Sequence, residues 1–248
     1  MSERRRTEQG FVLHSLPYRE TSLIVELFTR ESGRIPVIAK GARRPRSALR
    51  AVLLAFQPID FALAGRGELK ILAQAEWRGG LGMPQGEALL YGFYLNELIV
   101  RLLAREDPHP TLFDGYVTAL GELASAGAHE AVLRRFEWLL LQEIGYAPDL
   151  ACDAQGESIE AGAAYRIVSG QWTRTGGGER DAFAGTVLRD IAARRYDVPG
   201  VLTQAKRLNR MVLGEQLDGV PLKTRQMLLD LQRLDRDRRS GARGDPRN

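Results

Sequence analysis

The sequence is poor in the residues that build disulfide or metal frameworks. Its 248 residues include one cysteine, Cys152, and three histidines, His14, His109 and His129. One cysteine cannot form a disulfide within the chain, and the histidines lack the spacing of metal ligands, so we expect no metal site. No apolar run approaches the roughly 20 residues that cross a membrane. The first nine residues are polar and do not resemble a signal peptide, so we expect a cytoplasmic protein without a membrane partner.

The common catalytic motifs are also missing. The sequence has no Gly-x-x-x-x-Gly-Lys-Ser/Thr loop, no Gly-x-Ser-x-Gly elbow and no His-Glu-x-x-His pair. We therefore expect a protein that is not an enzyme and that needs no cofactor. A hydrolase built on carboxylates outside these motifs stays open as an alternative, and metal-dependent turnover of DNA would reveal it.

Acidic residues are scarce in one part of the chain. The net charge is +4, but residues 1–80 hold 14 Lys and Arg against 8 Asp and Glu, whereas residues 81–248 are slightly acidic. No acidic residue occurs between Glu31 and Asp60, while six basic residues do. A polyanion site is therefore expected in the first third of the chain.

The first 80 residues have the alternating pattern of short strands. We expect strands at 11–16, 22–29, 34–39, 51–64 (interrupted at Pro58) and 68–78. In the last of these, Leu69, Ile71 and Trp77 share the expected inner side and Lys70 lies on the other. Five strands without a confident helix favour a closed barrel of the OB-fold type, with an SH3-like barrel as the competing arrangement.

After residue 80 the apolar period changes from two to about 3.6, which indicates helices. We expect helices at 87–105, 111–126, 128–144, 182–195, 201–217 and 222–234, and a hairpin at 164–173. The sequence thus predicts an α+β protein with an OB-fold barrel (1–80), a linker (81–86), a helical domain (87–236) with an irregular insertion (146–181), and a polar tail (237–248).

The strand at 34–39 leads directly into a Gly- and Pro-containing basic segment. Arginine binds phosphate oxygens in pairs, and an acid-free loop can follow a phosphate chain, although a solvated surface loop would have the same composition. Two further basic groups lie elsewhere in the barrel and on the helix at 201–217. The candidate DNA-binding residues are Arg19, Arg34, Lys40, Arg43, Arg44, Arg46, Arg50, Lys70, Lys206, Arg207 and Arg210.

Aromatic residues of the first domain could stack on bases, although most are expected in the core. They are Tyr18, Phe28, Phe56, Phe61 and Trp77. In the helix at 128–144, Arg134 and Arg135 interrupt an apolar stripe. They could extend over the core, or they could border an apolar groove that binds an acidic peptide with an aromatic end.

Together these segments resemble the bacterial RecO recombination-mediator family. The resemblance begins with 11–15, 18–22, 28–29, 32–33 and 40–43, and continues in order with 95–98, 133–137, 145–146, 205–207 and 221–225. It implies an N-terminal OB-fold and a helical C-terminal domain. Some members have a four-cysteine zinc site in the segment equivalent to 146–181, but here only Cys152 remains, so zinc is not expected.

The resemblance also implies function. Members bind single- and double-stranded DNA and anneal complementary strands, and together with RecR they help RecA replace the single-stranded DNA-binding protein SSB. They also bind the acidic C-terminal tail of SSB, for which Arg134 and Arg135 are the candidates. The expected location is the cytoplasm, in association with the nucleoid. The alternative is a different OB-fold factor that binds RNA.

Overall fold

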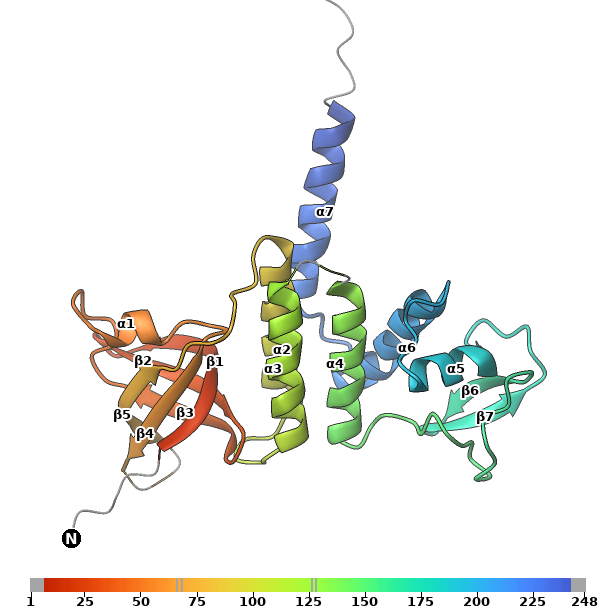
Figure 1. The fold of residues 1–248 in the computed structure, drawn as a ribbon, viewed down its shortest axis with the longest axis horizontal. Coiled ribbons are helices and arrows are strands. Elements are labelled where there is room, and N and C mark those ends of the chain that lie inside the picture. The colour runs from red at the N-terminus through yellow and green to blue at the C-terminus, as the bar shows by residue number, and fades with distance from the viewer. Residues whose placement is uncertain (1–6, 66, 68, 126, 128, 242–248) are drawn as a thin grey trace, which may run out of the picture.

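Five strands close into a barrel at one end of the molecule (Figure 1). The computed structural model describes residues 7–65, 67, 69–125, 127 and 129–241. The strands are β1 (Thr7–Tyr18), β2 (Ser22–Thr29), β3 (Gly33–Ala39), β4 (Pro58–Ala64) and β5 (Lys70–Trp77). They pair in the order β1-β2-β3-β5-β4, with β3 and β5 parallel and all other pairs antiparallel. This order is that of the OB-fold, so the predicted fold is confirmed over the SH3-like alternative.

The alternation of β2 and β3 explains the interior of the barrel. Val25 and Leu27 of β2 and Ile35 and Val37 of β3 are at most 2% exposed and pack in one core. The residues between them point outward, because successive side chains of a strand lie on opposite faces. The bounds predicted for β2 are those observed.

Two expectations for the barrel were wrong. β1 is longer than predicted, and residues 51–57 are not a strand, because the short helix α1 (Leu49–Val52) precedes β4, which begins at Pro58. Leu49, Val52 and Leu53 have helical spacing and pack against the barrel core. An apolar run of this length does not distinguish a helical turn from a strand.

The predicted orientation of β5 was also wrong. Leu72 is the buried residue, at 5% exposure, whereas Trp77 is 62% exposed. The pairing with β4 shifts between Ala62 and Leu63, so Ala73 has no partner. Such a bulge changes which residues face inward, and strict alternation cannot reveal it.

Helices α2 (Glu87–Leu102) and α3 (Pro110–Ala124) stand next to the barrel, and α4 (His129–Glu143) lies on their other side. Beyond them lie α6 (Val201–Gln216), α5 (Gly185–Ala192) and a small sheet of β6 (Ala164–Val168), β7 (Gln171–Thr175) and β8 (Phe183–Ala184). The predicted hairpin is β6–β7. No helix in the described part of the chain is long and apolar enough to span a membrane.

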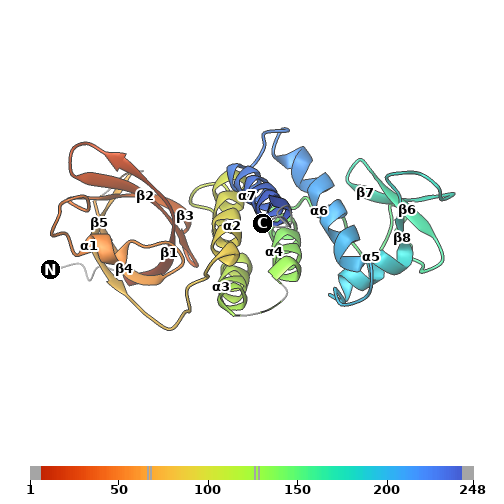
Figure 2. The ribbon, with the colours of Figure 1, turned by 90° about the horizontal axis from the view of Figure 1, so that it is seen from above.

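The last helix, α7 (Lys223–Gly241), rises away from the body in Figure 1 and is seen end-on in Figure 2. It continues five residues past 236, where we had expected the polar tail to begin. Asp230 and Arg233, one turn apart on this helix, form an ion pair at 3.8 Å, and opposite charges at this spacing support an exposed helix. The remainder of the predicted tail, 242–248, lies outside the described residues.

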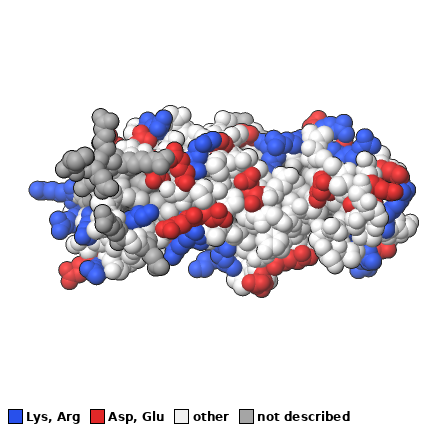
Figure 3. Space-filling model, turned by 90° about the horizontal axis from the view of Figure 1, so that it is seen from below, with Lys and Arg blue, Asp and Glu red and all other residues white. Residues whose placement is uncertain are grey.

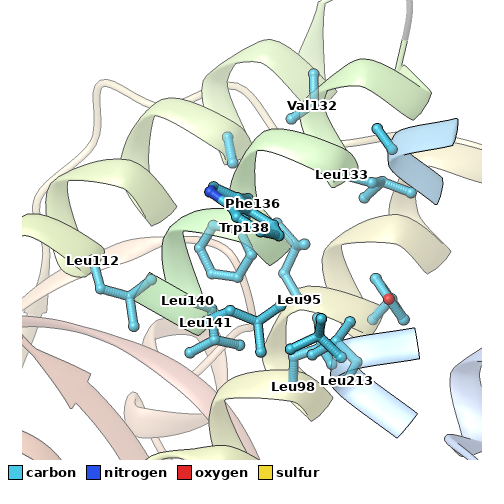
Figure 4. Close-up of a cluster of buried hydrophobic side chains, with 14 of the residues drawn as sticks. Leu95, Leu98, Leu112, Val132, Leu133, Phe136, Trp138, Leu140, Leu141 and Leu213 are labelled. Carbon is cyan, nitrogen blue, oxygen red and sulfur yellow. The ribbon is translucent and has the colours of Figure 1, made fainter. Parts of the chain in front are cut away.

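The barrel and the helices share one core. Phe11 of β1 and Phe28 of β2 pack against Phe113 and Tyr116 of α3, with ring centroids 5.3–5.7 Å apart. The same core continues through the helices, where Leu95, Phe136 and Leu213 lie together in Figure 4. Because aromatic side chains bury large apolar areas, this contact fixes the barrel against α2 and α3.

Polar contacts set the register of this junction. Asn96 of α2 is 2% exposed, and its Nδ2 donates to the Leu13 carbonyl at 3.0 Å. The Tyr116 hydroxyl donates to Asn96 Oδ1 at 2.6 Å. On the next strand, Glu26 accepts from Arg34 and Arg105 at 2.6–3.1 Å. Buried polar groups need such partners, so the two parts fit in one arrangement.

The close approach at Gly33 generates a stability prediction. Gly33 has φ of +67°, and a Cβ there would lie 2.1 Å from the Asp107 carbonyl oxygen. We expect Gly33→Ala to lower the free energy of unfolding by about 2–5 kcal/mol, from backbone strain and overpacking together. The matched control is Gly156→Ala, at φ of +79° with open space around it, which should lose only about 1–2 kcal/mol. Equal losses in urea denaturation would show that the junction is not tight.

Candidate nucleic-acid interface and cationic pocket

The basic segment forms a loop that rests on the β1–β2 turn. We call residues 40–50, which end in the first turn of α1, the basic loop. The Arg43 backbone N–H donates to the Thr21 carbonyl at 2.9 Å. Its guanidinium donates to the carbonyls of Arg19 and Glu20 at 3.3 and 3.2 Å. The fold therefore brings Arg19 next to the basic loop, and Arg43 helps to hold the two together.

The other cations of the basic loop are available to a ligand. Lys40, Arg44, Arg46 and Arg50 are exposed, and none forms an ion pair with a described carboxylate. Figure 3 shows Lys and Arg side chains projecting at the outer end of the barrel. Unpaired cations on one loop raise the local positive potential, which attracts polyanions.

Arg34 does not belong to this group. Its side chain is only 12% exposed and pairs with Glu26 at 2.6 Å. It also donates to the Leu103 carbonyl at 2.8 Å. The alternation of β3 placed Arg34 on the outer face correctly, but that part of the face is covered by the connection between α2 and α3. Arg34 is therefore a junction residue.

Lys70 also differs from its expected position. It lies opposite Val37, an interior position of β3, and is half-buried at the start of β5. Of the five candidate aromatics, Phe28, Phe56 and Phe61 are buried in the core. Tyr18 is half-buried beneath Arg19, whose guanidinium lies 5.1 Å from the ring centroid.

In the helical half, a buried carboxylate joins three helices. Glu137 of α4 is 1% exposed and accepts from Tyr94 of α2 at 2.6 Å and from Asn209 of α6 at 2.9 Å. Arg134, one turn earlier, pairs with it at 2.6 Å. Burial, and then the Glu137 charge, raises the pKa of Tyr94 well above its usual value, so this hydroxyl stays a donor.

A cavity of about 280 Å³ opens beside this cluster, between α2, α4, α6 and the start of α7. We call it the cationic pocket. Its apolar wall includes Leu133, Leu213, Leu217, Leu222 and Leu228. Its charged wall includes Arg134, Lys206, Arg210 and Arg225, with Glu130 as the acidic member. An apolar surface beside converging cations suits a ligand that is both anionic and apolar.

The cations of the pocket exceed its anions. Arg134 is matched by Glu137, and Lys206 pairs with Glu130 at 2.9 Å, which lowers the pKa of that carboxyl. Arg210 and Arg225 have no ion pair with a described residue. Burial lowers the pKa of Arg210, and the charges of Arg225 and Arg134 lower it further. Mutual repulsion of this kind is relieved when an anion binds.

The three basic candidates on α6 therefore lie in two different surroundings. Lys206 and Arg210 line the cationic pocket rather than extending the barrel surface. Arg207 points to the far sheet, where it donates to the carbonyls of Arg180 and Ala182 and lies 3.9 Å from the Phe183 ring centroid. Its contacts are structural.

Arg134 and Arg135 also lie in different surroundings. Arg134 lines the cationic pocket, and its Nε is buried without a partner among the described residues. Arg135 lies on another side of α4, where it pairs with Glu122 of α3. Contrary to our expectation, the two arginines therefore do not both line this pocket, because Arg135 faces α3 instead. Arg225, which sequence reasoning missed, lines the pocket where we had expected Arg135.

The start of α7 is fixed by a residue from α2. Glu97 accepts from the backbone N–H groups of Lys223 and Thr224 at 2.9 Å each, and from the Thr224 hydroxyl at 2.6 Å. The first N–H groups of a helix lack intrahelical partners, and a carboxylate there also complements the helix dipole. Glu97 thereby positions the wall of the cationic pocket that α7 supplies.

Cys152 sits in a short-range hydrogen bond. Its thiol donates to Asp149 at 3.0 Å, and this bond raises the pKa of Cys152. A protonated thiol is a poor metal ligand. Across the described residues, no group of three or more His, Cys, Asp or Glu could hold a metal ion.

Comparison with known proteins agrees with these observations. A family model described as "Recombination protein O N terminal" matches residues 1–81, and one described as "Recombination protein O C terminal" matches 83–226. The DNA repair protein RecO of Ralstonia nicotianae is 46% identical over 238 residues, which cover 94% of this chain and 88% of that protein. RecO of Azoarcus sp. is 45% identical over 243 residues, covering 94% of this chain and all of that protein. The chain belongs to the RecO family of DNA repair proteins.

The structure gives a reason for three of the segments that carried the resemblance. Residues 95–98 and 221–225 are far apart in the sequence, but Glu97 from the first binds the backbone of Thr224 from the second. The segment 133–137 supplies both Arg134 and Glu137. In this RecO-family chain, these motif residues hold α2, α4 and α7 around the cationic pocket.

Proposed function

We propose that this chain is a recombination mediator that acts without catalysis. In this proposal, the basic loop binds single- and double-stranded DNA and promotes annealing of complementary strands. The cationic pocket binds the acidic C-terminal tail of SSB. Together with RecR, the protein then helps RecA to replace SSB on single-stranded DNA in the nucleoid. The observation that carries the proposal is the presence of two separate groups of unpaired cations, one on the barrel and one beside the apolar pocket.

Annealing requires two polyanions to approach each other. Cations on the basic loop neutralise phosphates and release their counterions, which lowers the repulsion between strands. Backbone contacts of this kind do not read sequence, as suits a protein that must act on any gap. The candidates retained on this surface are Arg19, Lys40, Arg43, Arg44, Arg46 and Arg50.

The pocket fits a peptide that ends in an aromatic side chain and a free carboxylate. The leucine-lined wall can accept the ring, while Arg210 and Arg225 can pair with carboxylates. Arg134 contributes less free charge, because Glu137 already neutralises it. An RNA-binding OB-fold factor would need the basic loop but not the pocket, so the pocket favours the mediator over that alternative.

The first test concerns the basic loop. We expect the triple variant Lys40→Ala, Arg43→Ala and Arg44→Ala to bind single-stranded DNA more weakly. Its plot of log affinity against log salt should be shallower by about 2, at roughly 0.7 per lost phosphate contact. Fluorescence anisotropy across a salt series measures both quantities.

The matched control removes three exposed arginines from the far lobe, by which we mean β6, β7, β8, α5 and the segments between them. The changes are Arg166→Ala, Arg180→Ala and Arg189→Ala. It changes the net charge by the same amount but should retain the wild-type salt slope. Identical behaviour of the two triple variants would show that net charge, not the basic loop, governs DNA binding.

The second test concerns the cationic pocket. Arg210→Ala and Arg225→Ala should each weaken binding of a labelled acidic peptide ending in phenylalanine by roughly ten- to a hundredfold, because each removes a charge-assisted contact. Amidation of the peptide carboxylate should have a similar effect. Arg134→Ala is less informative, because it leaves Glu137 buried without its cation and should destabilise the fold by about 3–5 kcal/mol.

The matched control here is Arg135→Ala, on the same helix but outside the pocket. It should bind the peptide like the wild type. Weak binding by Arg135→Ala together with normal binding by Arg210→Ala and Arg225→Ala would move the tail site to the other side of α4.

A further inference from the structure

Four aliphatic side chains form a row across the outer face of the barrel. The strand registers place Leu16 of β1 opposite Ile24 of β2, Ile24 opposite Ile38 of β3, and Ile38 opposite Ile71 of β5. Paired residues of neighbouring strands point to the same face. Leu16 is 52% exposed, the other three are half-buried, and none belongs to the described core clusters. We call these four residues the aliphatic row.

The row has a cationic border on one side. Two residues further on lie Tyr18, the last residue of β1 on the same outward face, and Lys40, an exposed residue directly after β3. Arg19 covers the Tyr18 ring, and the basic loop is bonded to the turn that contains Arg19. The row therefore runs directly beside the basic loop.

The other border of the row is closed over β2 and β3. The next outward position of β2 is Glu26, which is occupied by Arg34 and Arg105. Beyond it, Phe28 is buried against α3. On β1 the border stays open, because His14, opposite Glu26, is exposed. On β2 and β3 a ligand is thus confined between the basic loop and the connection that joins α2 to α3.

We propose that the aliphatic row is the surface on which the bases of a single strand lie while the basic loop holds its phosphates. This inference rests on the proposed DNA binding by the basic loop. OB-folds bind oligonucleotides on the face of their second and third strands, and here that face offers branched aliphatic side chains instead of aromatic rings. Bases have apolar faces, and the row supplies an apolar surface of matching character.

Binding of bases to the aliphatic row would make the protein prefer single strands to duplexes. The bases of a duplex are paired and stacked inside the helix, so a duplex can reach the basic loop but cannot place its bases on the row. The row has no hydrogen-bonding side chain. It can therefore distinguish a strand that has bases from an abasic strand, but it cannot distinguish one base from another. It therefore favours single strands without reading their sequence.

Charge decides between the occupants that an apolar surface could have. The cations next to the row have no described acidic partner, so the occupant brings negative charge. A second copy of this chain would bring two basic loops together, which is unfavourable. A protein partner with an acidic rim is the remaining alternative, and the test below separates it from nucleic acid.

The test compares a short oligothymidylate with an abasic strand of the same length, which has the phosphates and sugars but no bases. The wild-type protein should bind the oligothymidylate roughly tenfold more tightly at the same salt concentration. The variant Ile24→Thr/Ile38→Thr keeps β-branching but removes apolar surface. It should lose most of this preference while its affinity for the abasic strand is unchanged.

The matched control is Val168→Thr, an exposed strand position in the far lobe, which should retain the wild-type preference. Leu16→Ser, at the most exposed position of the row, serves as a second variant if the double variant unfolds. Equal wild-type affinity for the two strands, or an unchanged preference in both row variants, would overturn the proposal and leave a protein partner as the occupant. Because the abasic strand reports phosphate contacts alone, failure of the basic loop would appear there separately, as weak binding with a flat salt dependence.

Discussion

The helical half of this RecO-family chain depends on the burial of one carboxylate, Glu137. It accepts hydrogen bonds from α2, α4 and α6 at once, and it neutralises Arg134 next to the cationic pocket. An ionised carboxylate is tolerated in a core only when it is paired and fully hydrogen-bonded, so the three helices must meet in this arrangement. One result is a pocket with a fixed shape. Another is that its spare positive charge lies on Arg210 and Arg225.

The junction between barrel and helices has a comparable role for the proposed DNA surface. The aromatic contacts of Phe11 and Phe28, and the hydrogen bonds of Asn96, leave little freedom between the two parts. The basic loop projects at the outer end of the barrel (Figure 1), whereas the cationic pocket is lined by residues of α2, α4, α6 and α7. The covered portion of the barrel face, around Glu26, ends where the aliphatic row begins. In the proposed function, the two kinds of anion therefore bind at separate places on the fold.

Much of the fold could be predicted from the sequence, because strand alternation and helical spacing are local signals. The bounds of β2 and the change from strands to helices after residue 80 followed directly. The orientation of β5 did not, since the bulge at Ala73 depends on its partner strand. The binding sites were harder to predict, because the sequence does not show whether a basic residue is free or forms an ion pair. Arg34 is bound by Glu26, and Arg135 by Glu122, through tertiary contacts that no local pattern reveals. Arg225 was missed because no local pattern shows that it is unpaired and lines the cationic pocket.

We propose that DNA and the acidic tail bind at different places on this chain. The most direct measurement is a titration of single-stranded DNA into the protein, with and without a saturating concentration of the acidic tail peptide. Exposed charges further apart than a Debye length, about 8 Å at physiological salt, hardly interact. The account predicts the same DNA affinity in both titrations and a complex that contains protein, DNA and peptide together. Displacement of the peptide by DNA, in a competitive manner, would contradict it.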